Sequence, residues 1–294
     1  MPMLIDPKHP EMRRRRFRSI PVRMLVPNFI TLLAICAGLT AIRLSTEGRM
    51  ELAVAAIVFA AVLDGIDGRV ARMIKGQSKF GAELDSLADF VNFGVAPGLI
   101  LYFWQLHELN NGGWIAAMVF AISGSLRLAR FNATMDDPNK PAFAANYFTG
   151  VPAPLGAITV LLPIYLAFLG LPRPPAMLTA AYTLLIGFLM VSRLPVFSGK
   201  TVRMRVPPEM VLPVFVSVVF FIALLIGYPW YILSACTVLY LLSLPAGWKS
   251  YRDQERRAAA QAVTPAPVTP SDPAAPFVSN VADAERDDRP ARLN

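Results

Sequence analysis

The stretch "LDGIDGRVARMIKGQSKFGAELDSLADF", residues 63–90, decides the fold because it places a group of carboxylates between two apolar segments. Asp64 and Asp67 close one segment, and Asp85 and Asp89 open the next. Residues three or four positions apart share one face of a helix, so each pair presents its carboxylates together. Two antiparallel helices joined by a short connection would bring the two faces into contact. The stretch therefore predicts a helical hairpin with an acidic site at one end.

The rest of the chain is strongly apolar, with 55% hydrophobic and only 16% charged residues among 294 and a mean hydropathy of +0.48. A helix needs about 20 apolar residues to cross the ~30 Å hydrocarbon core of a membrane. Runs of roughly that length lie at 25–44, 50–66, 86–106, 112–131, 152–171, 175–192, 210–227 and 229–248. We therefore predict an all-α fold, a polytopic bundle of about eight transmembrane helices.

The basic residues predict how this bundle is oriented. "RRRRFR" at 13–18 precedes the first run, and the connections at 67–80, 127–150 and 192–208 carry most of the remaining Lys and Arg. Positive residues favour the cytoplasmic side, so we expect both termini and the acidic stretch in the cytoplasm, at the cell (inner) membrane. The net charge of +8 is then a signal of topology. Nucleic-acid binding is not expected, since no basic groove with interleaved aromatic residues is present.

Three parts are predicted along the chain. Residues 1–24 form a basic cytoplasmic lead, and residues 25–248 form one membrane domain. Residues 249–294 contain "AAAQAVTPAPVTPSDPAAPF", a composition that cannot bury enough apolar surface to offset the entropy of ordering. We therefore expect a disordered cytoplasmic tail.

The acidic stretch is expected to bind metal. A carboxylate inside a membrane costs about 2.5–3.5 kcal/mol on insertion scales, so several together indicate a site with a neutralising partner. No Cys or His lies among them, and oxygen-only ligands favour Mg²⁺ or Mn²⁺. This much negative charge would suit two ions about 3.5–4 Å apart. The intervening glycines and basic residues suggest that a pyrophosphate group approaches the metals.

The array beginning at Asp64, D-x2-D-G-x2-A-R-x8-G-x3-D-x3-D, resembles the signature of the CDP-alcohol phosphatidyltransferases at every specified position. That resemblance implies a six-helix membrane core, here with two further helices, and usually a homodimer. It also implies transfer of a phosphatidyl or related group from a CDP-linked donor to an alcohol, with release of CMP.

The resemblance also assigns roles to residues. The four aspartates of the array would hold two divalent cations, and Asp89 stands at the position of the general base. The CDP pocket would be lined by Asp67, Gly68, Ala71, Arg72, Gly81 and Asp85. "VPNFIT" at 26–31 is similar to the family too and would place Asn28 and Thr31 near the nucleotide. A Pro–Asn helix start explains Pro27 and Asn28 equally well.

The acceptor alcohol is suggested by "SLRLARFN", residues 125–132. Arg127 and Arg130 share one helical face and, followed by Asn132, suggest an anion cradle. "RLARFN", "YFTGVPAP" (147–154) and "VSRLPVFSGK" (191–200) resemble the membrane-integral phosphatidylserine synthases, which implies CDP-diacylglycerol and L-serine as substrates. Either arginine could pair with the carboxylate of serine. The same arginines could instead bind the phosphates of the donor.

Other functions remain open at this point. Glycerol-3-phosphate, inositol and choline are alternative acceptors for the same chemistry. A divalent-cation transporter is disfavoured because its polar groups should follow successive depths, whereas these carboxylates cluster at one boundary. A non-catalytic scaffold would not need the complete set of aspartates.

Overall fold

The computed structural model describes residues 25–74, 78–134, 147–197 and 207–263. The basic lead at 1–24 and the last part of the predicted tail, 264–294, lie outside the described residues. The chain divides into two compact units, residues 1–253 and 254–294. All the residues that form the site belong to the first unit.

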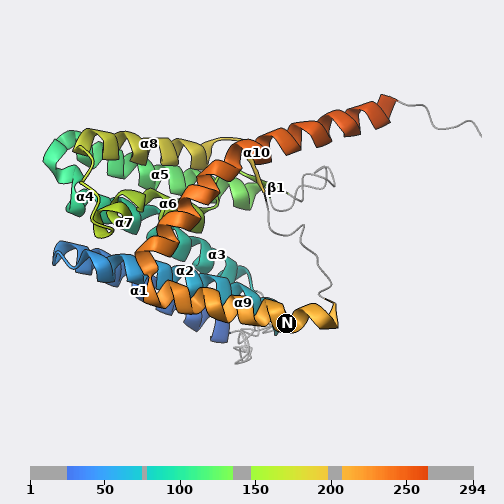
Figure 1. Cartoon of the computed structure of the whole chain (residues 1–294), viewed down its shortest axis with the longest axis horizontal. Coiled ribbons are helices and arrows are strands. Elements are labelled where there is room, and N and C mark those ends of the chain that lie inside the picture. Colours follow the sequence, from blue (N-terminus) through green and yellow to red (C-terminus); the bar gives the residue numbers. More distant parts are fainter. Residues whose placement is uncertain (1–24, 75–77, 135–146, 198–206, 264–294) are drawn as a thin grey trace, which may run out of the picture. The chain divides into compact units, whose positions relative to one another are not determined.

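Helices make up almost all of the described chain, as Figure 1 shows. They are α1 (Leu25–Thr46), α2 (Met50–Met73), α3 (Lys79–Asp89), η2 (Phe90–Val95), α4 (Ala96–Trp104), η3 (Leu106–Leu109), α5 (Asn111–Ala133), α6 (Ala153–Val160), α7 (Leu162–Phe168), α8 (Ala176–Val191), α9 (Pro208–Gly227) and α10 (Pro229–Val263). Each predicted apolar run falls on one or more of them. α10 continues beyond residue 248, the predicted end of the membrane domain.

Among the described residues, five helical segments are long and apolar enough to cross a membrane: α1, the continuous α3–η2–α4 segment, α5, α9 and α10. α8 is apolar but shorter, and α2 carries its aspartates within its length. Pro163 stands at the start of α7, directly after the chain bends between α6 and α7. A proline cannot donate the backbone hydrogen bond that would continue a helix. The chain is thus an all-α membrane bundle, while the predicted count of eight spans is not established.

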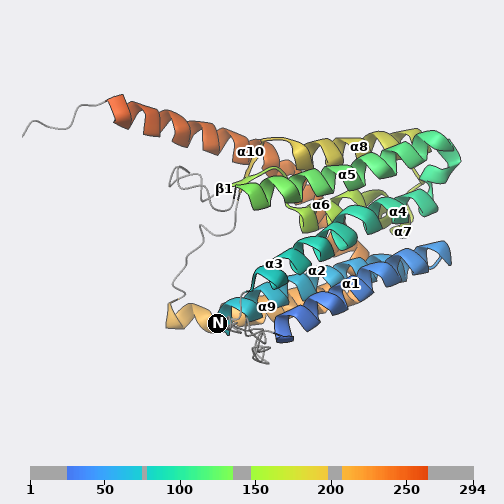
Figure 2. The ribbon, with the colours of Figure 1, turned by 180° about the vertical axis from the view of Figure 1, so that it is seen from behind.

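α1 and α2 form a hairpin and lie side by side along their length (Figure 2). Their shared surface is built from small residues: Ala34 and Ala41 of α1 and Ala53 and Ala60 of α2 are almost completely buried. Small side chains let membrane helices approach closely, because lipid provides little hydrophobic drive for their association. This packing places the end of α2, with its aspartates, against the start of α1.

The α3–α4 segment passes through a π-helical turn, η2, that lies against α5. Pro97 in the first turn of α4 cannot donate to the carbonyl four residues before it, and a widened turn accommodates such an interruption. Gly94 of η2 packs on Gly124 of α5, where an added Cβ would lie 3.1 Å from the Gly94 Cα. α5 is held in turn against α8. These contacts direct the final turns of α5 toward the end of α3.

Within the described part of the chain, the exception to the all-α prediction is a two-stranded ribbon, in which β1 (Tyr147–Thr149) pairs antiparallel with β2 (Pro195–Phe197). Gly150 follows β1 with a φ of 78°, and a Cβ there would lie 2.5 Å from the Met190 carbonyl oxygen. Only glycine tolerates both this backbone conformation and such a close approach. The ribbon joins two of the segments on which the sequence resemblance rests, and it lies at the end of α8.

The last two helices differ from each other. Almost all of the α9 side chains are exposed, and the helix is apolar on every side, as expected of a helix facing lipid. α10 packs on the core, where Trp230 contacts Tyr165 and Phe168, with ring centroids 6.4 and 4.6 Å apart. It also buries a set of hydroxyl groups, Ser234 and Thr237 among them.

Candidate active site

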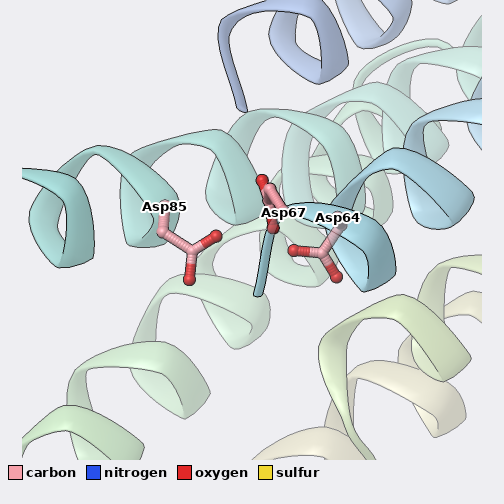
Figure 3. Close-up of side chains that lie close together, drawn as sticks. All are labelled: Asp64, Asp67 and Asp85. Atoms are coloured by element: carbon pink, nitrogen blue, oxygen red, sulfur yellow. The ribbon is translucent and has the colours of Figure 1, made fainter. Parts of the chain in front are cut away.

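Three of the predicted aspartates converge between α2 and α3. The carboxylates of Asp64, Asp67 and Asp85 face a common space, as Figure 3 shows. One oxygen from each lies within 4.8 Å of the others. Asp67 is the most enclosed of the three, with 3% of its surface exposed. The hairpin expected from the spacing of these residues therefore brings both helical faces together.

The start of α3 is fixed by a side-chain cap and by close packing on α1. The Ser78 Oγ accepts a hydrogen bond from the Gly81 N–H at 2.9 Å, the usual way to satisfy a free amide in the first turn of a helix. A Cβ on Gly81 would lie 2.8 Å from the Asn28 Oδ1. The structure therefore brings two predicted pocket residues, Asn28 and Gly81, into contact.

Thr31 orients one of the carboxylates. Its Oγ1 is buried and lies 2.7 Å from the Asp67 Oδ2 and 3.0 Å from the Pro27 carbonyl oxygen, so its single O–H is shared between two acceptors, of which Asp67 is the nearer. A hydrogen bond of this kind helps to fix the direction of a carboxylate. Thr31 was predicted to lie near the nucleotide, and its hydroxyl contacts Asp67 and the Pro27 carbonyl.

Asp89 and Arg127 form a second part of the site. Asp89 lies one turn beyond Asp85, outside the group of three, and is close enough to interact electrostatically with Asp64, Asp85 and Arg127. Arg127 is 9% exposed, and its guanidinium lies 5.4 Å from the centre of the Phe131 ring. Within the described ranges no residue forms a hydrogen bond or ion pair with this guanidinium. Its N–H donors are therefore available to a ligand beside Asp89.

The other two members of the predicted anion cradle have structural partners. The Arg130 guanidinium donates to the backbone carbonyl of Val191 at the end of α8. The Asn132 Nδ2 donates to the Ser86 Oγ on α3 at 2.9 Å. These contacts hold the end of α5 against its neighbours. The structure thus separates Arg127 from the two residues with which the sequence grouped it.

The face of α2 that carries Gly65 and Gly68, called the glycine face below, is not covered by other described parts of the chain. Among the described residues, no neighbouring atom lies within 4 Å of a Cβ added to Gly65, and at Gly68 the nearest is an Arg72 guanidinium nitrogen at 3.7 Å. Arg72 itself is exposed, and Ala71 is half-buried. A bare backbone beside an arginine suits a bulky anion such as a phosphate.

The carboxylate group fits a hard divalent cation. At 4.8 Å and an effective dielectric constant of about 20, two ionised carboxylates repel each other by about 3.5 kcal/mol. Keeping all of them ionised therefore requires positive charge among them. Opposite oxygen ligands of Mg²⁺ are about 4.2 Å apart and those of Ca²⁺ about 5 Å, so the observed separation needs little adjustment. All the donors are oxygens, the ligand type that these cations prefer.

Two neighbouring residues were missed by the sequence interpretation. Asn92, in η2 one turn beyond Asp89, has both amide atoms buried without a hydrogen-bond partner in the described structure. A lone amide in an apolar run could have drawn attention to it. Tyr240 of α10 lies close enough to interact electrostatically with Arg127. No spacing in the sequence relates these two residues, because α10 reaches the site only through tertiary packing.

These features define an integral membrane enzyme whose acidic site is suited to binding a divalent cation and a phosphate-bearing ligand. The family model for CDP-alcohol phosphatidyltransferase matches residues 24–197. A second model, CDP-alcohol phosphatidyltransferase 2, matches residues 209–245. The chain belongs to the CDP-alcohol phosphatidyltransferase family, which confirms the resemblance found in its motif.

Similar proteins extend the match over most of the chain. The CDP-diacylglycerol–serine O-phosphatidyltransferase of Mycobacterium leprae is 39% identical over 235 residues, covering 79% of this chain and 77% of its own. The protein of the same name from Mycobacterium tuberculosis (strain H37Rv) is 37% identical over 230 residues, 78% of this chain and 79% of its own. That of Bacillus subtilis is 34% identical over 154 residues, 50% of this chain and 80% of its own.

Proposed function

We propose that this enzyme transfers the phosphatidyl group of CDP-diacylglycerol to L-serine, giving phosphatidylserine and CMP. The observation that carries the proposal is the position of Asp89. Its carboxylate is close enough to interact with Asp64 and Asp85 of the acidic group and with Arg127 of α5, which is buried and has no hydrogen-bond or ion-pair partner in the described structure. The names of the relatives in Mycobacterium and Bacillus agree with this choice of substrates.

The reaction is a single displacement at phosphorus. The serine hydroxyl oxygen attacks the phosphorus that carries diacylglycerol, and the bond from this phosphorus to the bridging oxygen breaks, so that CMP leaves with that oxygen. Asp89 accepts the proton of the hydroxyl as general base. Two divalent cations, Mg²⁺ or Mn²⁺, held by Asp64, Asp67, Asp85 and Asp89 would neutralise the diphosphate and stabilise the leaving CMP.

The protein groups around the carboxylates would position the donor. Gly68 and Ala71 leave room for the diphosphate on α2, and Arg72 supplies a cation beside it. Asn28 and Gly81 are in contact at the start of α3 and would border the cytidine part. Thr31 keeps Asp67 aimed at the metals.

Arg127 would bind the carboxylate of serine. It lies beside Asp89, where the acceptor hydroxyl must be, whereas Arg72 lies on the glycine face assigned to the phosphates. A guanidinium can bind a carboxylate through two parallel hydrogen bonds. Arg130 and Asn132, engaged with Val191 and Ser86, would support the end of α5 rather than contact serine.

The membrane arrangement follows from the charge pattern. Eight transmembrane helices with both termini in the cytoplasm would place the aspartates at the cytoplasmic face of the inner membrane. There the lipid donor stays in the leaflet while serine and metal ions arrive from water. A homodimer is expected from the family.

The test is an acceptor comparison with purified protein. CDP-diacylglycerol and Mg²⁺ or Mn²⁺ are supplied with L-serine, glycerol-3-phosphate, inositol or choline, and CMP and lipid product are measured. We expect serine alone to give both products, EDTA to stop the reaction and added metal to restore it. CMP release with another alcohol but not with serine would refute the proposed acceptor.

A further inference from the structure

α10 carries three buried hydroxyl groups on one face. Ser234, Thr237 and Tyr240 follow one another at intervals of three residues, and each hydroxyl is buried without a hydrogen-bond partner in the described structure. A buried polar group without a partner is unfavourable, and most so in a membrane, where no water replaces the partner. This row therefore indicates a ligand that would supply acceptors.

The row is unlike the other helical Ser and Thr residues. Such residues commonly bond to a carbonyl three or four positions earlier, and in the described helices this is true of Thr40, Ser45, Thr46, Ser86, Ser123, Thr183, Ser217 and Ser243. Ser243 does so within α10 itself, to the Tyr240 carbonyl at 2.7 Å. The helix thus permits the local bond, yet the hydroxyls of Ser234 and Thr237 do not make it.

An apolar cavity of about 220 Å³ adjoins the row. Thr237 and Tyr240 line it together with apolar residues of three other helices: Val58 of α2, Leu155 and Ile158 of α6, and Phe221 of α9. Tyr240 also lies beside Arg127. The cavity is therefore hydrocarbon-like along most of its wall and approaches the proposed reaction site at Tyr240.

We propose that this cavity binds one acyl chain of the lipid donor, with the hydroxyls of Thr237 and Tyr240 donating to the ester carbonyls of its diacylglycerol part. The inference rests on the proposed function and adds a binding site for the lipid portion. Ester carbonyls only accept hydrogen bonds, so they match unpaired hydroxyl donors. An acyl chain matches the apolar wall, and the phosphate attached to the same glycerol would lie toward the proposed reaction site, which the cavity approaches at Tyr240. A water-soluble ligand would place its polar groups against this apolar wall, which is unfavourable.

The first test removes the hydroxyls while keeping the shape of the side chains. Tyr240→Phe and Thr237→Val should each raise KM for CDP-diacylglycerol about three- to tenfold, the loss expected of one neutral hydrogen bond, with KM for serine unchanged. Ser243→Ala is the matched control, since its hydroxyl is bonded to its own helix and its KM values should not move. Thermal unfolding of each variant shows that the fold is intact.

The second test narrows the cavity. Ile158→Phe should lower kcat/KM for a donor with two oleoyl chains severalfold more than for one with two octanoyl chains. Ile222→Phe is the control, because Ile222 is on α9 but exposed and outside the cavity lining. Equal losses for both donors would overturn the proposal.

The outcomes separate this inference from the proposed function. A wild-type protein that transfers nothing to serine refutes the proposed function. An active wild type whose Tyr240→Phe and Thr237→Val variants keep the donor KM refutes only the lipid site. A shift in the serine KM instead would assign the hydroxyls to the acceptor and also overturn the inference. Bulk lipid would occupy the cavity if any phospholipid raised the unfolding temperature as much as CDP-diacylglycerol does while the variants kept the donor KM. That result would also overturn the inference.

Discussion

The polar side chains at the two ends of the helical bundle differ in whether they have partners within the protein. At the end formed by η3, the start of α8 and the end of α1, they pair with one another. Gln105 donates to the Pro174 carbonyl at 2.6 Å and accepts from the Thr179 hydroxyl at 2.8 Å, and Arg43 forms an ion pair with Glu47 at 2.8 Å. At the end formed by α2, α3 and α5, four carboxylates and Arg127 gather, yet in the described structure none of the carboxylates forms an ion pair with a basic side chain.

This difference separates structure from function. Paired polar groups satisfy themselves and contribute to stability, so that end needs nothing from outside. Like charges held together by helix packing need cations and substrate to balance them. The same helical bundle therefore has paired polar groups that stabilise it at one end and charged groups that need ligands at the other. Substitutions at the two ends should accordingly affect different measurements.

The largest effect is expected for Asp89→Asn. The amide cannot accept the serine proton, so kcat should fall by about 10²–10⁴, the usual contribution of a general base. Binding of CDP-diacylglycerol, measured without serine, should persist because Asp64, Asp67 and Asp85 remain. Glu51→Gln, the same change at an exposed position in the first turn of α2, is the control and should leave turnover intact. Full turnover in Asp89→Asn would remove this residue from the mechanism.

A smaller effect is expected for Arg127→Gln. Loss of a charged partner for the serine carboxylate should raise the serine KM about ten- to hundredfold, the worth of a hydrogen bond to a charged group. Arg130→Gln is the comparison, because Arg130 is bonded to the Val191 carbonyl. That variant should lower the unfolding temperature and leave the serine KM nearly unchanged. The reverse pattern would exchange the roles of the two arginines.

Gly68→Ala should lower kcat/KM about tenfold without loss of stability. In the described structure the new methyl group meets no atom closer than the Arg72 guanidinium at 3.7 Å, but it enters the space assigned to the diphosphate and would displace it. Gly112→Ala, at the opposite end, places its methyl 4.0 Å from Leu109 and should leave activity unchanged. An active Gly68→Ala enzyme would show that the donor does not approach this face.

The convergence of the aspartates could be predicted from sequence because it depends on local spacing. Residues 64 and 67, and residue 85 after a short connection, lie on two consecutive helices, so helical geometry alone brings them together. Asp89 lies four residues after Asp85 and so on the same face of the helix, one turn further along, where it interacts with Asp64 and with Arg127. The family match then followed from the same spacing.

Interactions between distant helices could not be predicted in this way. Arg127 and Arg130 lie in the same motif and on the same helical face, so the sequence gives them the same expected role. The hydrogen bond from Arg130 to the Val191 carbonyl of α8 distinguishes them in the structure. Tyr240 lies beside Arg127 because α10 packs on the bundle. The spacing of residues in the sequence does not predict that packing. The ribbon of β1 and β2 joins segments separated by the whole of α6–α8. Non-local packing decides each of these contacts.

The smallest effect on activity is expected for Thr179→Val, at the paired end. Removal of its hydroxyl leaves the Gln105 Oε1 with one partner fewer in a buried site, which should lower the free energy of unfolding by about 1–3 kcal/mol. The metal requirement and both KM values should stay at wild-type levels well below the unfolding temperature. Thr40→Val is the control, since the Thr40 hydroxyl is exposed and bonds only to its own helix. A change in the serine or metal requirement of Thr179→Val would mean that the two ends are coupled, and that the unpaired charges depend on the pairing at the opposite end.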